Sequence, residues 1–332
     1  MLRLVRNSIP AILCWLSLVW CSDKSMASST AELDPLRETG AGSRPESGNG
    51  YRDIVLFRNK LVAVGAGGRI DGITQEGDRV RLDSSCPYTF RCAYASNEIV
   101  VAAGDNGSIL YSFDGKKFYR TTSGTQKNIY AITSRNGVMI AGADSGIILF
   151  SKNGTTWTSS KTALKGNLIS LTSNTSFFIG VSDSGEITKS YDGLHWEIQD
   201  YNKEYAGYTR RITLRKIYAN QNSVIIVGVH DDGSPAVLFS SLGTVWAERE
   251  PVYQDAQGVY ASLTQKPNAI AYDPDRDQYI VACDHGELFS LPSCSKCDKY
   301  LKISESDLQA LVYYDNRLFI VGDGFSVFIQ PL

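Results

Sequence analysis

The string Ser190-Tyr191-Asp192-Gly193-Leu194-His195-Trp196 (SYDGLHW) places an acid, a histidine and a tryptophan within seven residues. It recurs as SFDGKKF at 112–118, SKNGTTW at 151–157 and SSLGTVW at 240–246. All four strings have Ser first, Gly fourth and an aromatic residue seventh, and three have Asp or Asn third. These residues are Ser112, Asp114, Gly115, Phe118, Ser151, Asn153, Gly154, Trp157, Ser190, Asp192, Gly193, Trp196, Ser240, Gly243 and Trp246. Ser, Asp and Asn oxygens close turns by accepting backbone N–H groups, and Gly takes positive φ. The repetition therefore predicts a structural turn, and His195, at a variable position, is expected to have no catalytic role.

A second pattern recurs with the same spacing. Apolar runs end at Gly65, Gly104, Gly142, Gly180, Gly228, Cys283 and Gly322, so successive copies lie 39, 38, 38, 48, 55 and 39 residues apart. This period is typical of propeller blades. Within one unit, 129–133, 138–141, 147–151 and the segment from 156 read as four antiparallel strands joined by Asn/Asp-Gly turns. We predict an all-β fold, a seven-bladed β-propeller of four-stranded antiparallel blades, over residues 51–332.

The last copy supplies only three strands, at about 308–314, 318–321 and 325–330. We expect a strand from 33–39 to complete the last blade and close the ring, because closure removes exposed strand edges. The alternative is a linker, since the stretch from Glu38 to Gly50 is rich in Gly, Ser and Pro.

The four strings resemble the Asp-box of sialidase-like (BNR) propellers, Ser-x-Asp-x-Gly-x-x-Trp, with one residue fewer between Asp and Gly. This variant is similar to the one in exported bacterial propellers related to photosystem II assembly factors. The resemblance covers residues 51–332 and implies the fold. For function it implies two alternatives: an Asp-box glycoside hydrolase, or an assembly or scaffold factor. Sialidase-like enzymes carry an Arg-Ile-Pro signature that this sequence lacks, and they have six blades rather than seven.

The start of the chain predicts export. Arg3 and Arg6 precede the apolar run Ile9–Trp20, and Ser25-Met26-Ala27 offers small residues for cleavage, which is typical of a signal peptide over 1–27. Residues 28–50 would then form an N-terminal segment in the periplasm, at the cell surface or outside the cell. Lipidation of Cys21 is the alternative. The run is too short to span a bilayer comfortably.

Four cysteines form two close pairs. In an exported chain, Cys86 with Cys92 and Cys294 with Cys297 predict local disulfides. For Cys294 and Cys297, free thiols, a redox pair or half a zinc site are alternatives. Cys283 has no obvious partner in the sequence.

The functional face is expected opposite the repeated string, where the turns between second and third strands meet the connections between blades. Acids recur there just after the repeated Gly, at Asp105, Asp144, Asp183, Asp232, Asp284 and Asp323. They are either turn residues or a ring that holds a cation or polar ligand. The two long connections contribute Tyr201, Tyr205, Tyr208, Arg210, Arg211, Tyr253, Asp255 and Tyr260.

Tyr and Arg are enriched at recognition sites, so these connections predict binding of a protein or glycan partner. The alternative is that their rings pack onto the scaffold. No residue is assigned a catalytic role, and no metal or other cofactor is expected beyond the alternative of a bound cation. The net charge of −2, without a basic cluster, argues against nucleic acid or anionic membrane as the main partner. We expect a monomer.

Overall fold

The computed structural model describes residues 49–82, 84–207, 209–254, 260–292 and 299–332. The predicted signal peptide, the segment 33–39, Tyr208, Asp255, Cys294 and Cys297 lie outside the described residues. The predictions made for them stay predictions.

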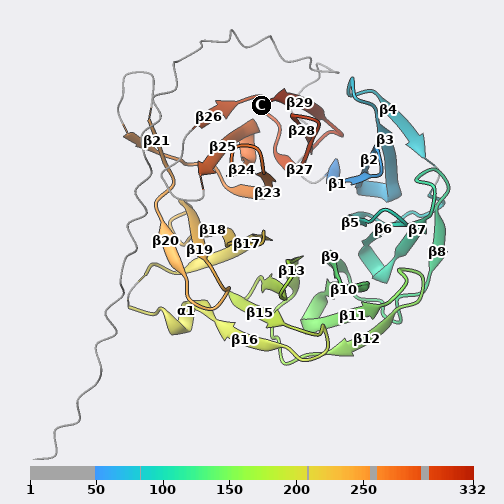
Figure 1. Ribbon diagram of the computed structural model, residues 1–332, viewed down its shortest axis with the longest axis horizontal. Helices are drawn as coiled ribbons and strands as arrows, with labels where there is room; N and C mark the ends of the chain where they lie inside the picture. The colour runs from blue at the N-terminus through green and yellow to red at the C-terminus, as the bar shows by residue number, and fades with distance from the viewer. Residues whose placement is uncertain (1–48, 83, 208, 255–259, 293–298) are drawn as a thin grey trace, which may run out of the picture. The chain divides into compact units, whose positions relative to one another are not determined.

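The described chain folds into seven successive antiparallel sheets that follow one another around a ring (Figure 1). The first three sheets are β1 (Tyr51–Phe57), β2 (Lys60–Gly65), β3 (Arg69–Ile73), β4 (Arg79–Leu82); β5 (Phe90–Ala95), β6 (Val100–Gly104), β7 (Ile109–Ser112), β8 (Tyr119–Thr121); and β9 (Ile129–Arg135), β10 (Val138–Ala143), β11 (Ile147–Ser151), β12 (Thr158–Lys161). The next two are β13 (Leu168–Ser173), β14 (Phe178–Ser182), β15 (Glu186–Ser190), β16 (Glu197–Asp200); and β17 (Ile212–Ala219), β18 (Val224–His230), β19 (Pro235–Ser240), β20 (Ala247–Arg249). The last two are β23 (Pro267–Asp273), β24 (Gln278–Cys283), β25 (Glu287–Pro292), β26 (Lys299–Lys302); and β27 (Leu308–Tyr314), β28 (Arg317–Gly322), β29 (Val327–Pro331). The predicted seven-bladed propeller is confirmed.

Two additions lie in the long connections. A four-residue helix, α1 (Tyr201–Glu204), follows the fourth blade, and a hairpin of β21 (Val252–Gln254) and β22 (Tyr260–Ser262) follows the fifth. Among the described residues, no helix is long and apolar enough to cross a membrane.

The apolar runs form the second strand of each blade and are buried on both sides. In β2, Val62 and Val64 face the second blade, whereas Leu61 and Ala63 face the seventh. Side chains alternate along a strand, so a strand between two other blades must be apolar at every position. The seven hydrophobic clusters each join two neighbouring blades, and the seventh-to-first cluster, with Tyr51, is one of them. The ring is therefore continuous.

The repeated string forms the turn between the third and fourth strands, as predicted. In the second blade, Asp114 Oδ1 accepts the backbone N–H groups of Lys116 (2.8 Å) and Lys117 (2.9 Å), and Ser112 Oγ accepts that of Gly115 (3.0 Å). Asn153 and Asp192 close the third and fourth turns in the same way. The aromatic residues Phe118, Trp157, Trp196 and Trp246 pack in or against the clusters between neighbouring blades.

His195 lies on the surface of its turn. Its Nδ1 is 2.7 Å from Asp192 Oδ2, and its side chain is 89% exposed. The histidine and the backbone N–H groups of the turn hold the pKa of Asp192 well below its usual range. The expected turn role of Asp192 is thus met, and His195 is one of its partners.

The ring closes between the seventh and first blades. Gly50 forms a β-bridge with Asp323, and the Gly324 N–H donates to the Asn49 carbonyl at 2.7 Å. In the first blade, buried Asp71 accepts from the Tyr51 hydroxyl and from Arg69 Nε (2.7 Å). The Arg69 guanidinium in turn lies 4.3 Å from the ring centre of Phe325 in the seventh blade.

The predicted disulfide between Cys86 and Cys92 is wrong for this structure, in which both are free, buried thiols. Cys86 packs between the first and second blades, whereas Cys92 faces the third blade. The two side chains therefore lie on opposite sides of the second blade. Burial raises the pKa of the Cys92 thiol.

Candidate functional site

The inner strand of each blade, which is the first strand in sequence, has a β-bulge near its start. The bulge follows the first residue of the strand in six blades and the third residue, Leu214, in β17. The residues at the seven bulges are Arg52, Arg91, Tyr130, Ile169, Arg215, Asn268 and Gln309. Each bulge lies opposite the end of the second strand, and therefore at the end of the ring that carries the turns between second and third strands. Bulges redirect side chains and are frequent beside functional sites. We call this end of the ring the bulge face.

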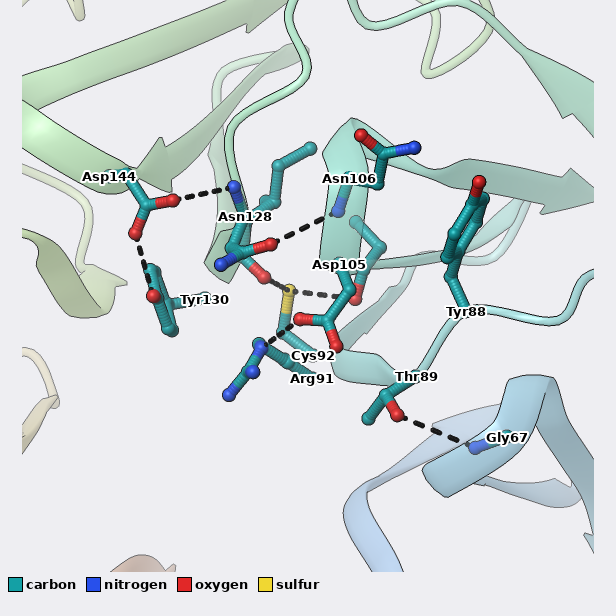
Figure 2. A network of polar contacts seen from close by, with 12 residues as sticks. Gly67, Tyr88, Thr89, Arg91, Cys92, Asp105, Asn106, Asn128, Tyr130 and Asp144 are labelled. Atoms are coloured by element: carbon teal, nitrogen blue, oxygen red, sulfur yellow. Dashed lines mark hydrogen bonds and ion pairs between the residues drawn. The ribbon is translucent and has the colours of Figure 1, made fainter.

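The turns on this face are joined from blade to blade by a repeated hydrogen bond, which we call the junction bond. The middle residue of the turn has positive φ, and its N–H donates to the side-chain oxygen just before the next inner strand. The junction bonds are Gly67 to Thr89 (3.4 Å), Asn106 to Asn128 (3.1 Å), Ser145 to Asn167 (2.9 Å) and His285 to Asp307 (2.9 Å). Figure 2 shows the first two side by side. At the closure, the Asn49 carbonyl takes this place for Gly324.

The six predicted axial acids lie in these turns, and each accepts hydrogen bonds from nearby residues. Asp144 accepts from the Tyr130 hydroxyl (2.6 Å) and the Asn128 N–H (2.8 Å), and Asp105 pairs with Arg91 (Figure 2). The others bond to neighbours as follows: Asp183 to Asn167, Asp232 to Arg210 and Ser234, Asp284 to Asn268, and Asp323 to Arg52 and Gln309. The described residues contain no group of three or more His, Cys, Asp or Glu that could hold a metal ion. These hydrogen bonds link the acids to the turns and inner strands of the bulge face.

Asp232 illustrates the electrostatics of these turns. The Ser234 hydroxyl and N–H donate to its carboxylate at 2.5 and 2.9 Å and lower its pKa to about 2. The carboxylate stays ionised at neutral pH and holds Arg210 at 2.7 Å.

The first long connection packs onto the scaffold more than the sequence predicted. Tyr201, expected to bind a partner, is fully buried in the cluster between the fourth and fifth blades. Tyr205 stacks on it with ring centres 4.7 Å apart, and the Tyr205 hydroxyl accepts the backbone N–H of Trp246 at 3.0 Å. The prediction of a binding role is wrong for Tyr201, because no part of the ring reaches the surface. Tyr205 has a structural role as well.

The remaining predicted residues lie nearer the surface. Arg210 and Arg211 are exposed, and Tyr260 on β22 is 58% exposed. Tyr253 on β21 packs against the cluster between the fifth and sixth blades. The structure therefore brings Arg210 together with Asp232 on the bulge face, while Tyr253 takes the packing role left open by the sequence.

The three arginines at the bulges were missed in the sequence analysis. They are Arg52 in the first blade, Arg91 in the second and Arg215 in the fifth. Arg215 reaches the sixth blade, where it donates to the Pro267 carbonyl (2.9 Å) and to Asn268 Oδ1 (2.6 Å). Arg91 contacts Asp105 through Nε, and Figure 2 shows its terminal nitrogens directed away from the acid. A signal existed in the sequence: Arg, Tyr, Asn or Gln stands at this position of the inner strand in six blades, and Ile169 stands there in the fourth.

Comparison with known proteins agrees with a seven-bladed propeller. YCF48 from Cyanidioschyzon merolae superposes with a TM-score of 0.63 at 14% identity, over 90% of this chain and 99% of that one. A structure of YCF48 bound to D1 peptide gives 0.64 at 13%, over 92% and 100%. The WD40 propeller domain of Doa1 gives 0.63 at 11%, over 85% and 93%. At these identities the likeness shows the fold alone.

No family model matches the chain, and no curated protein matches it. The resemblance to Asp-box propellers therefore rests on the four repeated strings.

Proposed function

We propose that this chain is an exported, non-catalytic propeller that binds a segment of a partner protein on its bulge face and acts as a scaffold or assembly factor. The observation that carries the proposal is the row of bulged residues at one end of the ring, which includes three arginines, a tyrosine, an asparagine and a glutamine. Arg side chains with fixed acceptors beside them suit a peptide, because a peptide offers both carbonyl oxygens and N–H groups.

Two further points support a protein partner. The acids of the bulge face accept similar hydrogen bonds from local donors. No two of them therefore differ from the rest as the carboxylate pair of a glycoside hydrolase would. The solved structures similar in fold include YCF48, a photosystem II assembly factor, bound to a peptide of D1. For export, the basic start and apolar run are the support, and the N-terminal residue of the protein isolated from its own cells tests it.

The binding test uses Arg52→Gln with Arg91→Gln in the full chain. We expect peptide-array binding to fall at least about tenfold, since two charge-assisted contacts are lost, while the melting temperature stays within a few degrees. Arg58→Gln is the matched control, because Arg58 is an exposed arginine at the other end of the first blade. Undiminished peptide binding by the double variant would contradict the site. Binding to a glycan array that is lost in the same variant would instead identify a carbohydrate ligand.

A further inference from the structure

Exposed apolar side chains gather on the face opposite the bulge face. Among the described residues, nine large hydrophobic side chains are exposed, and five of them lie in the repeated turns. These five are Phe113 in the second blade, Tyr191 and Leu194 in the fourth, and Leu242 and Val245 in the fifth. Leu194, Leu242 and Val245 are 64%, 67% and 75% exposed. Such exposure at the tips of turns favours contact with another surface.

The third blade provides an internal comparison. Its turn has the same hydrogen bonds and the same fold, yet its variable positions hold Lys152, Thr155 and Thr156. The second turn combines Phe113 with the exposed lysines Lys116 and Lys117. The turn chemistry therefore does not require apolar residues at these positions, and their presence in the fourth and fifth blades needs another reason.

The apolar tips are held in place by bonds to the backbone of their turns. Lys189 Nζ donates to the Leu242 carbonyl at 2.7 Å, and Arg135 donates to the Tyr191 carbonyl at 2.8 Å. Lys60 does the same for the Asp114 carbonyl at 3.0 Å. Each of these bonds joins a turn to the preceding blade. The backbone of these turns is thus held in place, and the Tyr191 ring also contacts Phe177 edge-on, with ring centres 6.5 Å apart.

We propose that this face rests on a lipid bilayer, with the tips of the fourth and fifth blades in the headgroup region and the lysines of the second and third blades beside anionic lipids. A bilayer is flat and accepts apolar side chains at separate points, whereas a protein contact concentrates its apolar residues in one central patch. Here the apolar tips occupy the second, fourth and fifth turns, and the lysine-bearing third turn lies between them. Lys116, Lys117 and Lys152 complement an anionic surface locally, although the net charge of the chain is −2. The bulge face would remain open to its partner.

The test is hydrogen exchange of the full chain with and without vesicles. Two compositions serve: phosphatidylcholine alone, and phosphatidylcholine with about 30% phosphatidylglycerol, a fraction that supplies a negative surface. We expect slower exchange over 190–196 and 240–246 with both vesicles, more so with the anionic ones. The turn 151–157 reports the same motif without apolar tips and should slow least of the three. This local readout separates the turns from the apolar run at 9–20, which would bind vesicles by itself.

The variant is Leu194→Ser with Leu242→Ser and Val245→Ser, which changes only exposed side chains. We expect the protection of both turns from exchange to disappear. The dissociation constant for vesicles, obtained from the exchange of these turns as lipid is added, should rise about tenfold or more. Tyr88→Ser, an exposed ring 36% accessible on the other face, is the control and should leave protection unchanged. Equal exchange of the turns with and without both vesicles overturns the proposal. So does protection that appears without lipid as protein concentration rises, because that assigns the tips to a second copy of the chain.

Discussion

Single residues in the turns of the bulge face decide how closely neighbouring blades approach. Gly107, the last residue of the 105–107 turn, has φ +63°, and a Cβ added there would lie 2.0 Å from the Thr125 carbonyl oxygen. Gly146 and Gly286 meet the backbone of their own blade connections in the same way. Glycine is needed at this position for its conformation and also for space, because the obstructing atom is backbone.

Gly107→Ala separates these two requirements when it is compared with Gly137→Ala. Gly137 has φ +76° but open space around it, so the substitution should lower the free energy of unfolding by about 1 kcal/mol, for conformation alone. Gly107→Ala should cost about 2 kcal/mol more, since the connection at Thr125 must move. Denaturant unfolding measures both. Equal losses would show that the connection yields without cost.

Asp114 gives the repeated turn a dependence on pH. Backbone N–H groups of Lys117 and Lys116 lower its pKa from 3.8 to about 2. A pKa that is lower in the folded state contributes stability above the unfolded value, and that stability is lost as pH falls through the folded value. Asp114→Ala should therefore lower the melting temperature at pH 7, and the difference from wild type should shrink between about pH 4 and pH 2.

The third blade supplies the control for this pH profile. Asn153 holds the same N–H groups with an amide that does not titrate in this range. Asn153→Ala should lower the melting temperature by an amount that stays constant from pH 7 to pH 2. A parallel pH profile for the two variants would refute the role given to the Asp114 charge.

Among the elements, the seventh sheet differs from the other six. Its outer strand β29 has no fourth strand beside it among the described residues, whereas every other blade has four. The pairing of Gly50 with Asp323 and of Asn49 with Gly324 brings the chain to this blade just after the segment 28–48. An unpaired edge at this position favours pairing with a segment of the same chain.

We predict that residues 33–39 pair with β29. Deletion of 28–45, or Leu33→Asp with Leu36→Asp, should lower the melting temperature by about 5 °C, as expected for a loss of roughly 2 kcal/mol in a domain of this size. Ser43→Asp with Ser47→Asp, in the Gly/Ser/Pro-rich stretch, should change it little. A deletion variant that melts at the wild-type temperature would leave β29 as a natural edge.

The elements also show what a sequence can and cannot predict here. The blades and their turns follow from local chemistry: Gly at positive φ, Asp and Ser as turn acceptors, and apolar strands. The disulfide between Cys86 and Cys92 was wrong because spacing says nothing about which side of a blade a side chain faces. Tyr201 was misassigned for a related reason, since its burial depends on the fifth blade, which comes later in the chain.

For the molecule as a whole, the junction between the seventh and first blades holds the ring together. The buried Asp71 accepts from Tyr51 and Arg69, and Arg69 also contacts Phe325 across the junction. Burial, together with Asp71, raises the pKa of Tyr51, so its hydroxyl remains a donor at neutral pH. Removal of the Asp71 charge should therefore weaken the junction that closes the ring.

Asp71→Asn should therefore lower the free energy of unfolding by about 3 kcal/mol, because it leaves a partly buried arginine without its counter-ion. We expect the loss to appear as one shifted transition when far-UV and near-UV circular dichroism are compared. Asp78→Asn, at an exposed position of the same blade, is the control. Two separate transitions would mean that the blades do not unfold as one unit.

The junction bonds have one more consequence, for how such rings arise and diverge. In all four of them the donor and the acceptor are 22 residues apart. The donor belongs to one repeat and the acceptor to the next, so duplication or loss of a whole repeat preserves the offset. Insertions after the fourth and fifth blades interrupt it, yet the sixth blade keeps it despite having lost the Ser-x-Asp-Gly string. This constant offset is a marker of common descent between repeats that outlasts their visible similarity.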